Sequence, residues 1–529
     1  MPETFESRRE SDVAQLGFWR IAQDDPGRLT LVEPDHTQHT AGELLAATNQ
    51  VVHGLRELGL QRGDTVALLM PNNAPWLEVL LAAQQAGWYL VPINYHLVGP
   101  EIAYIVNDSQ AKAFITHERF AEEVLRAVEE IDVDERARFA VGEVPGFRPY
   151  EELKAGQPTD LPDDRSAGAM MNYTSGTTGR PKGVKRDLPD IDPDTMVELG
   201  TFLNQLFEIE PFSDNVHLTV APLYHTAVGQ FTQNAIHAGH TAVLMDKWTP
   251  EGTLERIERY RVTTSHMVPT MFTRLLNLPE QERERHDVSS LRAMIHSAAP
   301  CPVHVKQAML DWWGDVVWEY YAATEGGGTI ASPSDWRKKP GTVGKPWPIS
   351  EIKILDEDGN ELPPGEIGTV WMKMGDRTFE YHGDEEKTKK SWNEQGFFTV
   401  GDAGEVDEDG WLFLRDRKSD MIISGGVNIY PAEIESVLFE HPAVLDVAVF
   451  GIPHDDWGEE VKAAVDLAEG YEPSAELEQD IIEHCRANLA KFKCPRSVDF
   501  VDDFPRSPTG KVYKRKLRDP YWEGREAKI

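Results

Sequence analysis

Short apolar runs alternate with amphipathic stretches through most of the chain before residue 416. The runs 64–70, 89–94 and 112–116 are typical of buried strands, whereas 77–87 and 101–108 have the spacing of helices. Strands that alternate with helices over short connections form parallel sheets with helices on both faces. The sequence therefore predicts an α/β fold with a large N-terminal domain of helix-covered, mostly parallel sheets.

Local signals support this alternation. Thr40 and Glu43 have the spacing of a capping box, leucines and valines then recur at helical intervals, and Gly59 marks the expected end of that helix. Further strands are expected at 241–246, 262–268 and 291–297. The acidic stretch 187–194, which contains two prolines, is expected to be an exposed loop.

The pattern changes near residue 416. From there a helix (432–442), two strands (443–452 and 460–467), a helix (476–489) and a strand (496–501) are expected, which is a small α+β unit of ordinary domain size. We therefore predict a large N-terminal domain over 1–416 and a small C-terminal domain over 417–529. The short charged segment at about 417–420 is the expected hinge.

The composition excludes several classes of protein. Lys and Arg number 53 against 89 Asp and Glu, and a net charge of −36 argues against binding to nucleic acid or anionic lipid. Three unpatterned cysteines make neither a disulfide framework nor a metal cluster. The N-terminus lacks an apolar core for a signal peptide, and the most apolar stretch, 76–93, is too polar to span a bilayer. A cytoplasmic enzyme without an integral membrane segment is expected, and a homo-oligomer is compatible with the sequence.

The segment YTSGTTGRPKGV, residues 173–184, carries the strongest chemical signal. Glycines let backbone N–H groups close around phosphate oxygens, hydroxyls donate hydrogen bonds, and a lysine neutralises charge. The segment is not a Walker loop, because GxxxxGK[ST] is absent. The alternative is a flexible linker, which the fixed basic pattern of Arg180 and Lys182 disfavours.

With this loop in view, the sequence resembles the adenylate-forming enzymes, which include acyl-CoA synthetases, luciferase and the adenylation domains of peptide synthetases. Beside the loop, eight further segments follow in the family's order, at 91–112, 222–227, 290–302, 319–328, 341–348, 400–420, 425–435 and 505–518. The resemblance thus extends over nearly the whole chain. It implies that 1–416 is an ATP- and acyl-binding domain and that 417–529 is a mobile C-terminal domain.

The resemblance implies a set of residues that bind ATP. They are Thr174, Ser175, Gly176, Thr177, Thr178, Gly179, Lys182, Ser297, Ala298, Ala299, Glu319, Tyr320, Tyr321, Thr324, Asp402, Arg417 and Lys511. Within this set Thr174, together with Glu325, would support Mg2+, which prefers oxygen ligands. Tyr321 would stack on adenine, Glu319 would accept from its amino group, and Asp402 would accept the ribose hydroxyls.

The resemblance also implies residues for catalysis and for movement between two half-reactions. Lys511 would stabilise charge at the α-phosphate, and His225 would gate the place where the acyl pocket meets the thiol path. Gly425 and Gly426 would let a pantetheine arm pass. Ser419 stands at the hinge position, where relatives carry Asp or Lys, and Ala322 replaces the usual glycine after Tyr321.

Each assignment has a structural alternative. Asp402 could be a turn aspartate and Glu325 a helix cap. Lys511 lies in a basic tail that could simply be solvated, and His225 could be a structural histidine. The four residues Thr174, Glu325, Asp402 and Lys511 together argue against a non-catalytic nucleotide-binding protein.

The implied reaction is that of an acyl-CoA synthetase. A carboxylic acid and ATP give acyl-AMP and pyrophosphate, after which CoA takes the acyl group and AMP leaves. Segment 222–227 contains no aspartate to pair with an amine, which disfavours an amino acid, and 227–231 offers an apolar wall that could equally be core. A medium- or long-chain fatty acid is expected, with a steroid-like or aromatic acid as the alternative. No fused carrier domain is expected after residue 518, which favours free CoA, and a separate carrier protein is the alternative. A luciferase-like monooxygenase would share these motifs.

Overall fold

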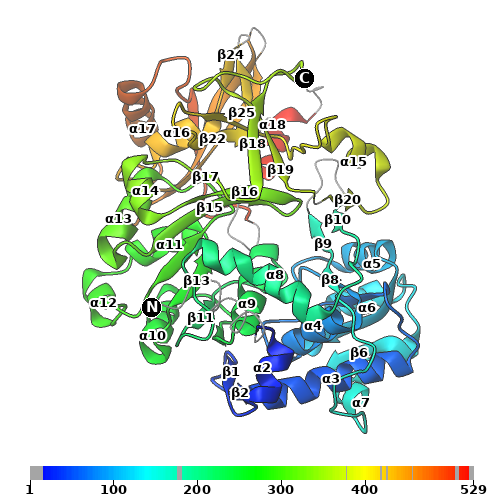
Figure 1. The fold of residues 1–529 in the computed structure, drawn as a ribbon. Helices are drawn as coiled ribbons and strands as arrows, with labels where there is room; N and C mark the ends of the chain where they lie inside the picture. Colours follow the sequence, from blue (N-terminus) through cyan, green and yellow to red (C-terminus); the bar gives the residue numbers. More distant parts are fainter. Residues whose placement is uncertain are drawn as a thin grey trace, which may run out of the picture. The chain divides into compact units, whose positions relative to one another are not determined.

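The computed structural model describes residues 16–174, 181–376, 378–417, 420–424, 427–454, 457–506 and 512–523. By its internal contacts the chain divides into two compact units. The first unit comprises Met1–Met267, Leu278–Ile295 and Arg377–Lys390, and the second comprises Val268–Asn277, His296–Asp376 and Ser391–Ile529. Figure 1 labels the helices and strands of both.

The first unit contains two sheets with parallel strands at their centres. One has the order β7-β6-β5-β3-β4-β8, in which every pair is parallel. Its strands are β3 (Thr65–Leu68), β4 (Tyr89–Pro92), β5 (Ala111–His117), β6 (Arg138–Val141), β7 (Arg148–Pro149) and β8 (Ala169–Met170). In Figure 1 the helices around it are α3 (Ala41–Glu57), α4 (Ala74–Ala86), α5 (Gly99–Asp108), α6 (Ala121–Val128) and α7 (Tyr150–Lys154).

The other sheet of the first unit pairs β11 with β12 and β13, β12 with β1, and β1 with the antiparallel edge strand β2. These strands are β1 (Leu29–Val32), β2 (Gln38–Thr40), β11 (Val216–Thr219), β12 (Thr241–Leu244) and β13 (Thr264–Met267), and β14 (Ala293–His296) follows along the chain. The associated helices are α2 (Phe18–Asp24), α8 (Pro193–Leu206), α9 (Thr226–His237), α10 (Pro250–Tyr260) and α12 (Glu280–Arg285). A small antiparallel sheet joins β9 (Asn172–Thr174), β10 (Lys182–Lys185) and β20 (Glu380–Tyr381), and α15 (Glu385–Ser391) follows it.

The second unit is mostly antiparallel. A hairpin joins β15 (Val317–Ala323) to β16 (Gly326–Ala331), which pairs with β17 (Lys345–Pro346). A four-stranded sheet joins β18 (Ser350–Leu355), β19 (Gly368–Met374), β21 (Asp402–Val406) and β22 (Leu412–Arg417). The helices of this region are α11 (Pro269–Leu276), α13 (Val303–Trp313) and α14 (Pro333–Lys338).

The C-terminal part of the second unit is the expected α+β unit. Its strands are β23 (Ile422–Ser424), β24 (Val427–Ile429), β25 (Val444–His454), β26 (Gly458–Leu467) and β27 (Ser497–Phe500), and its helices are α16 (Pro431–Leu438), α17 (Ala475–Asn488) and α18 (Lys514–Trp522). Alternate residues of β25 face two apolar clusters: Val447 and Val449 pack with Ile434 of α16, and Ala448 and Phe450 pack with Leu517 of α18. A strand with this two-residue period buries both faces of its sheet.

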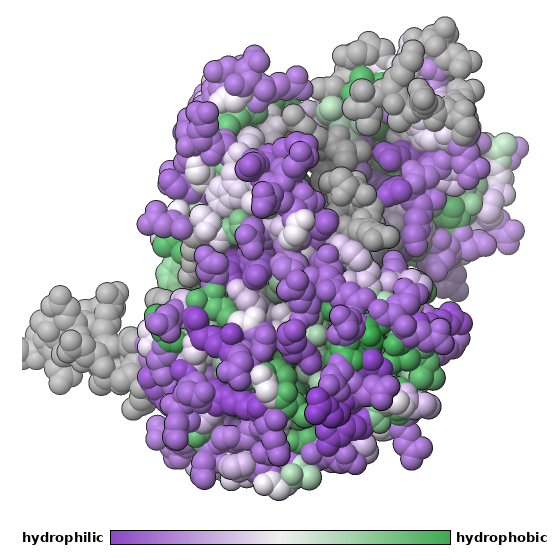
Figure 2. Space-filling view, turned by 90° about the vertical axis from the view of Figure 1, so that its right-hand side faces the viewer, coloured by the Kyte–Doolittle hydropathy of each residue, from purple (hydrophilic) through white to green (hydrophobic). Residues whose placement is uncertain are grey.

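The sequence-based assignments are largely confirmed. The capping box is present, with Thr40 Oγ1 accepting from the Glu43 N–H and Glu43 Oε2 accepting from the Thr40 N–H. The α/β fold class is confirmed as well. The face drawn in Figure 2 is mostly hydrophilic, as a highly charged chain requires. No helix among the described residues is long and apolar enough to cross a bilayer.

The prediction of an exposed loop over 187–194 is wrong at its end. Asp192 caps α8 by accepting from the backbone of Asp194 and Thr195, and Pro193 takes the first helical position. The Asp194 side chain is only 3% exposed. A proline after an aspartate therefore began a helix here rather than extending a loop.

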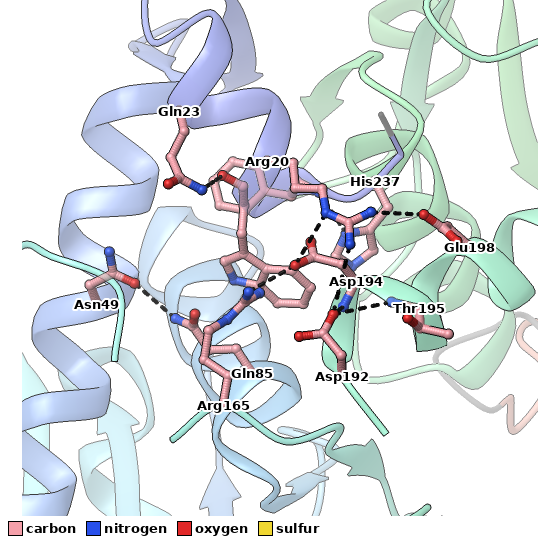
Figure 3. A network of polar contacts seen from close by, with 12 residues as sticks. Arg20, Gln23, Asn49, Gln85, Arg165, Asp192, Asp194, Thr195, Glu198 and His237 are labelled. Carbon is pink, nitrogen blue, oxygen red and sulfur yellow. Dashed lines mark hydrogen bonds and ion pairs between the residues drawn. The ribbon is translucent and has the colours of Figure 1, made fainter. Parts of the chain in front are cut away.

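Asp194 is the centre of a buried polar network in the first unit (Figure 3). Its Oδ2 accepts from Arg165 Nη1 at 2.8 Å and lies 3.6 Å from Arg20 Nε. The guanidinium of Arg165 also stacks on the Trp19 ring, 5.0 Å from its centre. At Gly17 (φ +109°), a Cβ atom would come within 2.6 Å of Asp194 Oδ1. Helix α2, the segment around residue 165 and α8 therefore share one buried carboxylate.

We expect Asp194→Ala to lower the free energy of unfolding of this unit by about 3–5 kcal/mol, because it leaves the Arg165 cation enclosed without its anion. Asp192→Ala is the matched control, since it removes the helix cap and only a partly exposed 4.0 Å contact with Arg20 Nη2, and should cost about 1 kcal/mol. Urea or thermal denaturation of both variants measures the difference. Equal losses in the two variants would contradict the role assigned to Asp194.

Candidate active site

Several residues predicted to bind the nucleotide come together within the second unit. Tyr321 on β15 donates its hydroxyl hydrogen to Asp402 Oδ2 on β21 at 2.6 Å. On the neighbouring strand β22, Arg417 is the backbone partner of Asp402. The ring predicted to stack on adenine is thus fixed against the carboxylate predicted to accept the ribose hydroxyls.

A hairpin presents the predicted magnesium residue. Ala323 pairs with Gly326, so Thr324 and Glu325 form a two-residue turn between β15 and β16. The register shifts beside this turn, between Ala322 and Ala323, and Gly327 adopts φ +67° there. A Cβ on Gly327 would lie 3.0 Å from Met372 Cβ, so glycine is required at this bulge. The turn and bulge together determine where the Glu325 carboxylate points.

The segment 297–300, predicted to line the adenine pocket, follows directly after β14. Ala298 has φ +73°, a left-handed conformation that is unusual for a residue with a Cβ. Such strain costs about 1 kcal/mol and persists only where the surrounding structure imposes it. Ser297 is buried and its side chain hydrogen-bonds to Tyr320 of β15. Segment 297–300 and β15 therefore pack against each other, and together we call them the wall of the predicted adenine pocket.

Glu319 lies at the base of this wall and does not face water. Its Oε2 accepts from Lys306 Nζ at 2.7 Å and lies 3.4 Å from His296 Nε2. Burial raises the pKa of Glu319, but Lys306 and His296 outweigh burial and leave the pKa at about 2. The predicted hydrogen bond from Glu319 to the adenine amino group stays a prediction. Neither Lys306 nor His296 was anticipated from the sequence.

In the first unit, β9 and β10 determine the ends of the glycine-rich loop. Thr174 pairs with Lys182 across this hairpin. Tyr173 donates to Asp108 Oδ2 at 2.7 Å, and Tyr104 donates to the Pro181 carbonyl at 3.1 Å. The Lys182 ammonium lies 3.8 Å from Asp384 Oδ2. The two ends of the predicted phosphate loop are therefore held side by side.

His225 precedes α9 and belongs to an aromatic group that we call the Tyr95 cluster: Tyr95, His96, Phe120, Tyr224 and His225. Tyr95 stacks on Phe120 at 5.0 Å and meets Tyr224 edge-on at 5.1 Å, and Tyr224 lies 4.3 Å from His225. Burial lowers the pKa of His225 to about 3, with smaller contributions from His96 and His266. His225 is therefore a neutral imidazole at pH 7, and its buried Nε2 has no hydrogen-bond partner among the described residues.

Part of the predicted apolar wall is core. Phe231 is 2% exposed and Val228 is 4% exposed. Phe231 stacks on His266 with ring centres 5.3 Å apart and meets Phe207 at 5.5 Å. Phe231 therefore packs inside the first unit.

Other predicted residues lie outside the described residues: Ser175, Gly176, Thr177, Thr178, Gly179, Ser419, Gly425, Gly426 and Lys511. For Thr174 and Arg417 only the backbone is described. Among the described residues, no group of three or more His, Cys, Asp or Glu side chains could hold a metal ion. A single carboxylate such as Glu325 fits a magnesium ion that takes most of its oxygen ligands from ATP and water.

Comparisons with known proteins agree with this geometry. The pattern of the AMP-binding enzyme family matches residues 18–380, and that of the AMP-binding enzyme C-terminal domain matches 433–511. A feruloyl-CoA synthase of Amycolatopsis sp is 34% identical over 95% of this chain and 98% of its own. The long-chain-fatty-acid–CoA ligase FadD13 of Mycobacterium tuberculosis is 32% identical over 95% and 98%. The structure of the anthranilate CoA ligase AuaEII with anthranoyl-AMP aligns with a TM-score of 0.83, at 27% identity over 96% and 97%.

The chain therefore belongs to the AMP-binding, adenylate-forming enzymes. Within that family it is an AMP-forming acid–thiol ligase whose substrates include ATP and a carboxylic acid. This confirms the resemblance seen in the sequence. The individual residue roles and the domain border at 416 stay predictions.

We expect Tyr321→Phe to raise the KM for ATP about tenfold, because a hydrogen bond to a charged group contributes about 1.5 kcal/mol. The ring remains, so the KM for the acid should not change. Initial rates of pyrophosphate release at varied ATP measure this, with the half-exposed Tyr471→Phe as control. An unchanged KM for ATP would show that the contact with Asp402 does not shape the nucleotide site.

Four buried histidines make stability depend on pH. Burial lowers the pKa of His217, His225 and His237 to about 3 and that of His240 to about 4. An unfolded histidine has a pKa near 6.5, so below this pH the unfolded chain binds more protons than the native one.

Their stabilising contribution is therefore complete above pH 6.5 and is lost as the pH falls from 6.5 towards 3. We expect the Tm to fall between pH 7.5 and pH 5, and His217→Asn to reduce that fall. His39, whose pKa is raised by the hydrogen bond to Glu33, is the control, because His39→Gln should not reduce it. A Tm that is constant over this range would contradict the prediction.

Proposed function

We propose that this enzyme activates an apolar carboxylic acid with Mg-ATP and transfers the acyl group to CoA. The observation that carries the proposal is the contact between Tyr321 and Asp402, because it joins the two side chains whose chemistry suits adenine and ribose. The relatives named above include a feruloyl-CoA synthase and a long-chain-fatty-acid–CoA ligase, and these names support the same type of reaction.

The proposed reaction has two steps. An oxygen of the substrate carboxylate attacks the α-phosphorus of ATP, the bond to the β-phosphate oxygen breaks, and pyrophosphate leaves with its electron pair. The CoA thiolate then attacks the acyl carbonyl, and AMP leaves. The enzyme supplies position and charge stabilisation, and no covalent intermediate with the protein is required.

Glu325 and Thr174 are the proposed protein ligands of Mg2+. The ion would neutralise charge on the phosphates during the first step. Lys182 and the loop before it would bind the β- and γ-phosphates, and Lys511 would stabilise the α-phosphate. These roles come from the resemblance and agree with the anchored hairpin and with the turn that carries Glu325.

The acid that we favour is a medium- or long-chain fatty acid. Segment 222–227 carries no acidic side chain, and Leu223 and Tyr224 within it are buried. Because His225 is neutral, this region offers no charge to pair with a second ionic group on the substrate. An apolar acyl body suits such surroundings, since burying its surface contributes about 25 cal/mol per Å2.

A ring-bearing acid is the second candidate, and the Tyr95 cluster favours it. Its rings meet at 4.3–5.1 Å in stacked, tilted and edge-on pairs, which is the geometry in which an added aromatic ring would also pack. The feruloyl-CoA synthase among the relatives is named for an aromatic acid.

A panel of acids tests the proposal. We expect medium- and long-chain fatty acids to give CoA-dependent AMP, with malonate and amino acids giving at least about tenfold less. Pyrophosphate and AMP are measured with and without CoA. A preference for ferulate or benzoate would favour the second candidate. Product formation that ignores CoA would favour a carrier protein, and the absence of AMP with every acid would overturn the proposal.

A further inference from the structure

A lysine is enclosed completely within the second unit. Lys306 on α13 is 0% exposed, and its Nζ lies 2.7 Å from Glu319 Oε2. The Trp336 ring of α14 covers the ammonium, with 4.9 Å between Nζ and the ring centre. A buried ammonium is unfavourable unless an anion with good geometry compensates for its lost hydration. The structure therefore depends on Glu319 being present and ionised.

A histidine completes this group, which we call the Lys306 triad: Lys306, Glu319 and His296. The His296 ring is 0% exposed, and its Nε2 lies 3.4 Å from the same Oε2 atom of Glu319. The Phe272 ring of α11 meets it edge-on with ring centres 5.3 Å apart. Burial lowers the pKa of both His296 and Lys306. The carboxylate is thus held from two sides by groups that water cannot reach.

The residues of the Lys306 triad lie next to segment 297–300 and on β15. His296 is the residue before segment 297–300, and α13, which carries Lys306, begins shortly after that segment. Glu319 lies on β15 directly before Tyr320 and Tyr321. The contacts of Glu319 with His296 before the loop and with Lys306 after it therefore tie both sides of the strained loop at Ala298 to the strand that bears the two tyrosines.

We propose that Lys306 is a positioning residue for the nucleotide, which acts through Glu319 and His296 to hold segment 297–300 against Tyr320 and Tyr321. The inference rests on the proposed nucleotide role of those residues. An apolar group of similar shape could fill the space of Lys306 at little cost in stability. The charge of Lys306 therefore has a geometric role: its 2.7 Å contact with Glu319 sets the spacing between segment 297–300 and β15.

The test compares variants that remove the charges but keep the volume. Lys306→Met removes the ammonium partner of Glu319 and leaves only His296 beside the carboxylate. The double variant Lys306→Met/Glu319→Gln is therefore made beside it and carries the test if the single variant does not fold. Lys339→Met is the matched control, because Lys339 belongs to the same unit and forms ion pairs of 2.8 Å with Asp407 and Asp409 nearer the surface. The Kd for ATP is measured by calorimetry, and the KM values for ATP and for the acid by pyrophosphate release.

We expect the double variant to keep its Tm within a few degrees and to bind ATP about tenfold more weakly, with the KM for the acid unchanged. Misplacing a bound group by about 1 Å has effects of this size or larger. Lys339→Met should leave all three constants unchanged. Wild-type affinity for ATP in the double variant would overturn the inference. An equal rise in the KM for ATP and in the KM for the acid would overturn it as well, because that result indicates a general structural loss.

Inosine triphosphate, whose base lacks the amino group of adenine, distinguishes positioning by Lys306 from a direct contact between Glu319 and adenine. If Glu319 accepted a hydrogen bond from the adenine amino group, Glu319→Gln would reduce the preference for ATP over inosine triphosphate and Lys306→Met would not. Positioning predicts that both variants weaken the two nucleotides in parallel. Because calorimetry needs no acid, the inference is tested even if no acid in the panel is turned over, an outcome that would overturn the proposed function alone.

Discussion

Burial of parallel strands on both faces is the constraint on which the first unit depends. Every residue of β3 and β4 is buried, and neither strand can be joined to its parallel neighbour by a tight turn. Helices must therefore carry the chain back across the sheet, and the segments with chemical groups occupy the connections. Tyr95 and His96, between β4 and α5, lie in such a connection.

Charge inside both units is either paired or neutralised. Asp194 is matched by Arg165 and Arg20, and Glu319 by Lys306 and His296. The buried histidines lose their charge instead, as the lowered pKa of His217 and His237 shows. The abundant acidic residues are meanwhile left to the surface. A chain with so large a net charge keeps its interior stable by admitting few ionised groups and giving each a specific partner.

The fold could be predicted from local patterns because helices and strands have fixed periods. The capping box at Thr40 and the strands β3, β4 and β5 are examples, since each signal lies within a few residues. Contacts between distant residues left no such signal. The resemblance assigned Tyr321 and Asp402 to one nucleotide, but no local pattern indicates that their side chains meet across 81 positions. No local pattern indicates the pairing of Lys306 with Glu319 either. A hint did exist for Lys306, which lies one helical turn from Met309 and Leu310 on the apolar face of α13. The segment 187–194 was misjudged because its acidic composition suggested solvent, whereas Asp192, Pro193 and Asp194 begin a helix.

The bulge at Gly327 has a consequence for how this gene can change. Side chains on a strand alternate between the two faces, so one added or lost residue in β15 or β16 would turn Thr324 and Glu325 to the opposite side. Away from Gly327 and the residues assigned to the nucleotide, a single substitution in the hairpin keeps its register, whereas a change in length cannot be repaired by any single replacement. Among proteins descended from this chain, segment 319–331 should therefore keep its number of codons even where the encoded residues differ.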